Sequence, residues 1–204
     1  MALEDLTFKL YTDANLTTEF GGTLAVTHQT DLSDNPQDFL LYFGSTTADV
    51  KLQTTVNPGV DNITLTPTDI LPEWVTATAH VIGDAIEPTT PNGYRYVVVT
   101  EGTTGGAEPT WPTTVGSQVA DGTVVWQLAS ATHEPTEIKL ATSAVGLDSA
   151  TGGALLSLGN TITSGTANKV EVHVRVENTV TTVSDNTGQP EIGININDVT
   201  ETAV

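Results

Sequence analysis

Tryptophan and tyrosine are the side chains of this sequence best suited to recognition chemistry, and they gather in one stretch. Only 5% of the 204 residues are aromatic, yet all three Trp and two of the four Tyr lie between residues 74 and 126. A flat ring can stack on the C–H face of a sugar, while neighbouring Asn, Glu or Thr side chains supply hydrogen bonds. The candidate carbohydrate-binding residues are therefore Trp74, Tyr94, Tyr96 and Trp111.

The same rings are also needed for packing, because a unit of about 60 residues has a small core that is hard to fill. Trp126 alternates with apolar neighbours at every second position, which predicts that it points inward. Tyr94 and Tyr96 fall on one face of a strand. Trp111 lies in a loop that a proline stiffens on either side, so its ring either projects outward toward a sugar or belongs to the core.

One acidic cluster has oxygen atoms that would suit calcium, namely Asp31, Asp34, Asn35 and Asp38. Its spacing lacks the Gly and the terminal Glu of an EF-hand loop, and residues 33–36 are typical of an ordinary turn. The chain has no Cys, which excludes thiolate zinc sites and disulfides. We expect no metal and no cofactor, with calcium at this cluster as the alternative.

Catalytic signatures are missing from the sequence. No Gly-x-Ser-x-Gly, His-Glu-x-x-His or phosphate-loop motif occurs. His28 falls on the inward or edge side of a predicted strand and His173 on a polar face, and neither has a local nucleophile or base. Glu101 and Glu108 could form a glycosidase pair, but their Gly- and Thr-rich surroundings do not favour the burial that raises a carboxyl pKa. We expect that the protein is not an enzyme.

The elements that position these residues are strands, because apolar and polar residues alternate strictly in several segments. Alternation predicts strands over 6–11, 23–27, 137–140, 169–177 and 192–197. Turn signals separate them at Gly21-Gly22, Asn57-Pro58-Gly59, Gly152-Gly153 and Asp185-Asn186-Thr187-Gly188. No segment has a helical period of useful length. We predict an all-β fold, an antiparallel β-sandwich with a small inserted all-β module.

The aromatic stretch is predicted to interrupt the sandwich rather than follow it. Strand patterns run up to about residue 66 and resume at 137, and Pro72 and Pro135 flank the interruption. Insertions enter at exposed turns and need neighbouring ends. The expected domains are residues 1–72 plus 134–204 as one discontinuous sandwich, and 73–133 as the inserted module.

The charge of the chain limits its partners. Six Lys and Arg against 25 Asp and Glu give a formal net charge of −19, which repels nucleic acid and anionic lipid. Such a surface suits solubility at high copy number and equally suits a saline habitat. The acidic N-terminus is unlike a signal peptide, and no apolar run is long enough for a membrane helix. We expect a soluble protein made in a cytoplasm, with no membrane insertion.

Spacing within the aromatic stretch suggests a family. The motifs that carry the resemblance are Gly83-Asp84, Asn92-Gly93-Tyr94-x-Tyr96, Gly102-x-x-Gly105, Glu108-Pro109-Thr110-Trp111-Pro112 and Asp121-Gly122-Thr123-x-x-Trp126. With these motifs the stretch resembles a module that recurs in tailed-bacteriophage structural proteins and, distantly, the chitin-binding type of carbohydrate-binding module.

The flanking sequence contains a second set of motifs, at 38–45 and at 159–168 with the strand that follows. With these motifs it resembles phage virion domains carried on head or tail surfaces. These resemblances imply a capsid decoration, or cement, protein on the virion exterior, with the major capsid protein as partner. A homotrimer follows from the symmetry of a capsid lattice, and host surface glycan is a further possible ligand. The alternative is a tail or receptor-binding component that adheres to glycan through the inserted module.

Overall fold

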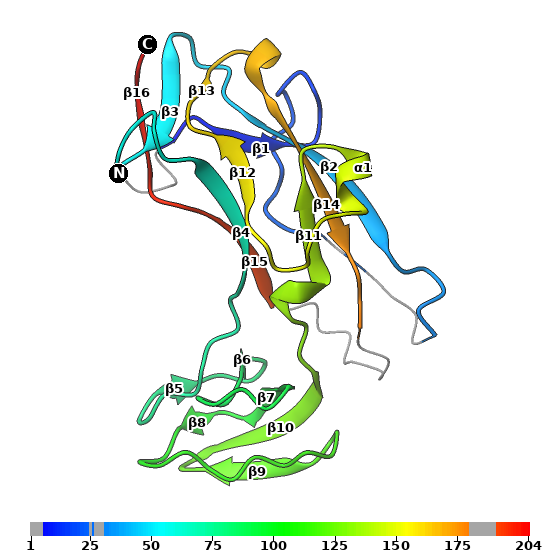
Figure 1. Ribbon diagram of the computed structural model, residues 1–204. Helices are drawn as coiled ribbons and strands as arrows, with labels where there is room; N and C mark the ends of the chain where they lie inside the picture. Colours follow the sequence, from blue (N-terminus) through cyan, green and yellow to red (C-terminus); the bar gives the residue numbers. More distant parts are fainter. Residues whose placement is uncertain (1–5, 25, 27–30, 180–190) are drawn as a thin grey trace.

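The computed structural model describes residues 6–24, 26, 31–179 and 191–204, which are built almost entirely from antiparallel strands (Figure 1). Helical structure in these residues is limited to short turns: α1 (Ala144–Leu147), η2 (Pro135–Glu137) and η3 (Thr166–Asn168). The all-β fold predicted from sequence alternation is confirmed.

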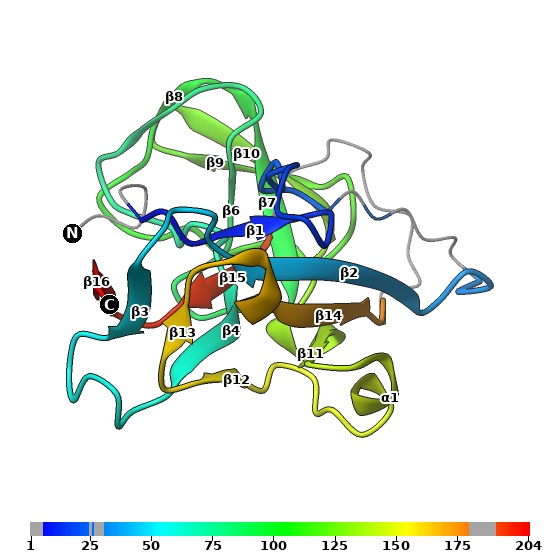
Figure 2. The ribbon, with the colours of Figure 1, turned by 90° about the horizontal axis from the view of Figure 1, so that it is seen from above.

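Two layers of sheet form the larger part of the molecule, called the sandwich below (Figure 2). A four-stranded sheet has the order β1 (Lys9–Tyr11), β2 (Gln37–Gly44), β14 (Val170–Val176), β11 (Ile138–Ala141). Two three-stranded sheets have the orders β12 (Leu156–Gly159), β4 (Ile63–Asp69), β15 (Ile192–Ile196) and β13 (Ile162–Thr163), β3 (Val50–Thr54), β16 (Val199–Ala203). Side chains from all three sheets meet in one hydrophobic cluster.

Strand β14 shows why the alternating sequence folds this way. Val172 and Val174 are fully buried and lie opposite Leu41 and Phe39 of β2. Because successive side chains of a strand point to opposite faces, His173 falls on the other side of the sheet. The strand prediction over 169–177 is therefore confirmed.

Two predicted strands differ from the structure near the N-terminus. Leu6 and Phe8 are buried as expected, but β1 begins only at Lys9, and Tyr11 rather than Leu10 is buried. In the predicted strand over 23–27, the described residues 23, 24 and 26 belong to no strand. The turn predicted at 185–188 and the orientation predicted for His28 lie outside the described residues.

A second, smaller group of strands holds the aromatic stretch, and we call residues 73–133 the aromatic unit. Its sheets have the orders β6 (Ala85–Ile86), β7 (Tyr94–Thr100), β10 (Val124–Ala131), β9 (Gln118–Asp121) and β5 (Ala79–His80), β8 (Gly102–Thr103). Trp126 is fully buried at the centre of the unit's own hydrophobic cluster, as its alternation predicts.

The two hydrophobic clusters share no residue. The chain passes between them twice, once after β4 and once between β10 and η2, and the aromatic unit projects from one end of the sandwich (Figure 1). That residues 1–72 with 134–204 and residues 73–133 fold as separate domains stays a prediction.

Candidate carbohydrate-binding groove

Trp111 lies on the loop between β8 and β9 and is half-buried. Its indole packs against Tyr96, with ring centroids 4.4 Å apart, and lies edge-to-face with Trp126, with ring centroids 6.1 Å apart. The indole Nε1–H donates a hydrogen bond of 2.8 Å to Oε1 of Glu108. The ring is therefore packed against the core and also borders the surface, and that it contacts a sugar stays a prediction.

Glu108 fixes this loop to the neighbouring segment. Its carboxylate accepts hydrogen bonds from the backbone N–H of Thr89 at 3.0 Å, from the Thr89 hydroxyl and from the Trp111 indole. Burial raises the pKa of Glu108, but the hydrogen bonds from Thr89 and Trp111 outweigh burial and hold the pKa below its usual value. Glu108 is thus an ionised anchor, whereas the general acid of a glycosidase needs a raised pKa.

A shallow depression of about 370 Å³ opens beside the ring of Trp111. Its lining residues are Pro88, Thr90, Asn92, Glu108, Pro109, Thr110 and Trp111. The volume falls in the range of small-ligand sites, and the lining combines one aromatic ring and two prolines with hydroxyl, amide and carboxylate groups. We call this depression the groove.

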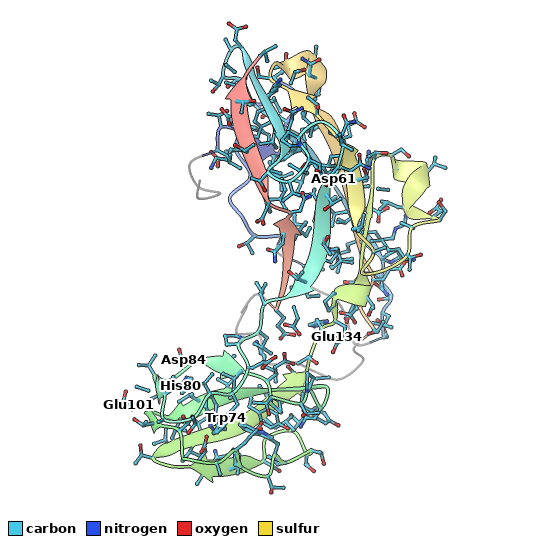
Figure 3. The ribbon with its side chains drawn as sticks, turned by 60° about the vertical axis from the view of Figure 1, so that its left-hand side comes forward. Asp61, Trp74, His80, Asp84, Glu101 and Glu134 are labelled. Atoms are coloured by element: carbon cyan, nitrogen blue, oxygen red, sulfur yellow. The ribbon has the colours of Figure 1, made fainter. Side chains whose placement is uncertain are left out.

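The structure corrects two of the four sequence-predicted site residues. Tyr96 is completely buried, and its hydroxyl donates to the carbonyl oxygen of Pro112 at 2.7 Å. Trp74 is 9% exposed and points into the interior of the aromatic unit (Figure 3). Neither ring has a free face for a sugar, because a small unit fills its core with the aromatic residues that it has. Tyr94 is half-buried against the same core and does not line the groove, so Trp111 is the predicted residue that remains.

Asp121 supports the interior of the aromatic unit, and sequence reasoning assigned it no role. The side chain is 4% exposed. Its Oδ2 accepts from the indole N–H groups of Trp74 at 2.7 Å and Trp126 at 3.2 Å, and its Oδ1 accepts from the backbone N–H of Gly105 at 2.7 Å. A usable signal was the Asp-Gly dipeptide at 121–122, which marks the turn between β9 and β10.

Three of the four residues considered for calcium, Asp31, Asn35 and Asp38, have different hydrogen-bond or ion-pair partners. Asp38 forms a two-pronged ion pair with Arg175, at 2.7 and 2.8 Å. Asp31 accepts from the backbone N–H of Ser33 at 3.0 Å, and Asn35 exchanges hydrogen bonds with the backbone of residue 178. In the part of the chain that the structure describes, no three His, Asp or Glu side chains converge as a metal site.

The fold and the groove define an all-β protein with a small projecting unit that carries a shallow, Trp-bordered depression. No family model matches the chain, and neither the curated proteins nor the solved structures give a match. Among the described residues, the helices are too short to cross a membrane.

Proposed function

We propose that this chain is a structural protein on the exterior of a tailed-phage virion, a capsid decoration protein whose aromatic unit faces outward. The observation that carries the proposal is the separation of two hydrophobic clusters, with the aromatic unit projecting from one end of the sandwich. With this division, the sandwich can bind the capsid while the projecting aromatic unit points away from the shell and can contact other molecules. The resemblance of both parts to phage virion domains supports the same role.

Attachment would use the sandwich, with the major capsid protein and other copies of the chain as partners. Strands β1 and β11 lie at the two ends of the four-stranded sheet among the described residues, so they are the strands of this sheet that a neighbouring chain would reach first. Their outer edges already make backbone hydrogen bonds within the chain, from Phe20 to Leu10 and from Gly153 to Ile138, so attachment would use side chains more than strand pairing. A homotrimer suits the three-fold positions of a capsid lattice.

The groove supports weak binding of host surface glycan. Trp111 provides an apolar surface at its margin, and Thr90, Asn92 and Thr110 provide polar groups. Glu108 in the lining and the net charge of −19 disfavour anionic polysaccharides, so a neutral glycan is the best match. One ring gives low affinity, which many copies on one particle would raise.

Glycan binding can be tested by blocking the groove without removing a core ring. Thr110 lines the groove and is exposed, so Thr110→Arg should abolish retention on immobilised neutral polysaccharide from the host. Thr113→Arg adds the same charge at an exposed position of the same loop outside the groove, and it should retain binding. Equal retention of the two variants would refute the groove as the binding site, and no retention of the unaltered protein would refute glycan binding.

The virion role is tested by the copy number of the chain in purified particles of the phage that encodes it. A decoration protein should reach roughly hundreds of copies, set by the capsid lattice, whereas a tail adhesin should reach tens or fewer. Its absence from particles would refute both roles, and a low copy number would favour the tail alternative.

A further inference from the structure

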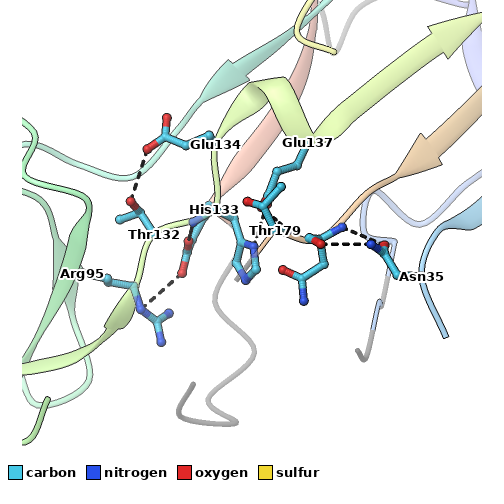
Figure 4. A network of polar contacts seen from close by, with 9 residues as sticks. Asn35, Arg95, Thr132, His133, Glu134, Glu137 and Thr179 are labelled. Atoms are coloured by element: carbon cyan, nitrogen blue, oxygen red, sulfur yellow. Dashed lines mark hydrogen bonds and ion pairs between the residues drawn. The ribbon is translucent and has the colours of Figure 1, made fainter. Parts of the chain in front are cut away.

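A network of polar contacts spans the place where the chain passes between the sandwich and the aromatic unit (Figure 4). We call this region the junction, and its central residues are Glu87, Arg95, His133, Glu137 and Glu191. Most of them are buried, and charges at such a place are costly unless they are paired.

Glu191 connects the two parts. Its Oε1 lies 3.3 Å from Nε of Arg95, which belongs to β7 of the aromatic unit, and the two side chains are 8% and 3% exposed. Its Oε2 accepts a hydrogen bond of 2.7 Å from the backbone N–H of His133. Its backbone oxygen accepts from the N–H of Ile70, directly after β4 of the sandwich. One residue thus contacts both passages of the chain.

His133 and Glu137 form the second part of the junction. His133 Nδ1 and Glu137 Oε2 are 2.7 Å apart, and the carboxylate also accepts from the backbone N–H of Thr179 at 2.7 Å and from the Thr179 hydroxyl. Hydrogen bonding to Glu137 raises the pKa of His133 despite its partial burial. Burial raises the pKa of Glu137, but its hydrogen bonds from His133 and Thr179 outweigh burial and lower the pKa.

Glu87 is the third part, and the groups that face it are mostly acidic. Glu87 is 7% exposed. Its backbone N–H donates to the carbonyl oxygen of Pro72, and its own carbonyl oxygen accepts from the N–H of Trp74, so both bonds go to the first passage. Burial, and after it four nearby negative charges, raise the pKa of Glu87 from 4.5 to about 7. Those charges are Asp69 at the end of β4, Glu134 before η2, Glu73 in the first passage and Glu191. Six carboxylates therefore share the junction with Arg95 and His133 as its positive groups among these residues.

We infer that the junction is a pH-dependent latch: protons on Glu87 and His133 fasten the aromatic unit to the sandwich, and loss of these protons loosens it. When Glu87 is ionised, a buried carboxylate faces four others, and when His133 is neutral, Glu137 loses its positive partner. The inference stands apart from the proposed function, because it concerns the position of the aromatic unit and not its ligand.

The direction of the pH effect follows from each raised or lowered pKa. Glu87 has a higher pKa when docked, so its contribution is complete below about pH 4.5 and is lost as the pH rises through about 7. His133 acts in the same direction, with its contribution complete below 6.5 and lost at higher pH. Glu137 sets the lower limit, because its lowered pKa gives stability that is lost as the pH falls below 4.5. The latch is therefore closed in mildly acidic solution and opens above neutrality.

The latch can be tested on the full chain by measuring ¹⁵N relaxation for the two parts separately. At about pH 5.5 the sandwich and the aromatic unit should share one rotational correlation time, and at about pH 8 the aromatic unit should tumble faster. A loosely tethered unit tumbles at a rate set by its own smaller size. Its correlation time should therefore fall to roughly half that of the sandwich. The change should have its midpoint near pH 7, the pKa of Glu87. Equal correlation times at both pH values would overturn the inference.

Variants separate the latch from a general effect of pH. Glu87→Gln removes one of the two titrating groups with nearly the same shape, so the difference between the two correlation times at pH 8 should shrink to the part that His133 contributes. Glu101→Gln removes one exposed charge from the aromatic unit away from the groups that face Glu87, and it should keep the wild-type response. If Glu87→Gln does not fold, Glu134→Gln at an exposed neighbour should move the midpoint to lower pH. A pH response unchanged in the folded Glu87 variant, or an unmoved midpoint in the Glu134 variant, would refute the latch.

Discussion

Replacing Asp121 by Asn should strongly destabilise the aromatic unit while leaving the stability of the sandwich unchanged. Asn has nearly the same shape as Asp but only one acceptor oxygen. If that oxygen takes the place of Oδ2, it keeps both indole donors, and the new amide group then faces the N–H of Gly105, donor against donor. A buried N–H without a partner costs about 1–3 kcal/mol, and hydrogen bonds to a charged acceptor are about twice as strong as neutral ones. We expect a loss of about 3 kcal/mol.

This loss is large for a unit of this size, whose core rarely supplies more than about 5 kcal/mol. All three Trp of the chain lie in the aromatic unit, so tryptophan fluorescence reports on this unit alone. Amide signals of buried residues such as Val174 report on the sandwich. The fluorescence transition should move to much lower temperature or denaturant concentration, and the amide signals of the sandwich should persist.

Asp84→Asn is the matched control. Asp84 also belongs to the aromatic unit, but its side chain is 41% exposed, and the change should cost less than about 1 kcal/mol. If Asp121→Asn unfolds at the same point as Asp84→Asn, the three hydrogen bonds do not stabilise the unit. If both parts of the molecule unfold together in Asp121→Asn, the aromatic unit is not separate.

Three further outcomes are expected. Deletion of residues 73–133 with a short Gly linker should leave a folded sandwich whose stability changes by about 1–2 kcal/mol, and an unfolded product by circular dichroism would show that the aromatic unit belongs to the sandwich core. Gly102→Ala should lower the free energy of unfolding by about 3 kcal/mol or more, because the added Cβ would lie 2.4 Å from the backbone of Thr123. In the control Gly106→Ala the added Cβ meets nothing within 4 Å, so thermal unfolding should be unchanged. Light scattering should report a trimer, and a monomer at micromolar concentration would contradict the proposed assembly.

The alternation of apolar and polar residues predicted individual strands and which of their side chains are buried, because both depend on neighbouring residues in the sequence. The strict alternation of Val172 and Val174 with polar residues has one solution, a strand with one buried face, and the structure has that strand. The burial of Trp126 followed from the same pattern. Alternation was wrong for residues 23, 24 and 26, which belong to no strand although Leu24 packs against the sandwich core.

The site was harder to predict because it depends on contacts between distant residues. Trp74 and Tyr96 are aromatic, as residues that stack on sugars are, but whether a ring is exposed depends on which strands cover it. The role of Asp121 appears only when three segments converge on its carboxylate. The pairing of Arg95 with Glu191 likewise joins two parts of the chain that have no shared local pattern.

The two passages of the chain leave different layers of the sandwich, which matters when the projecting unit is pulled. The first passage continues β4, the central strand of one sheet, which is hydrogen-bonded on both sides to β12 and β15. The second leads through η2 to β11, the last strand of the opposite sheet, whose one strand partner among the described residues is β14. Tension on the aromatic unit would thus divide between both layers and act along strands whose hydrogen bonds run across the direction of force. The aromatic unit is therefore held to the sandwich by two strands, β4 and β11. Under tension, β11 would separate first, because it pairs with one strand whereas β4 pairs with two.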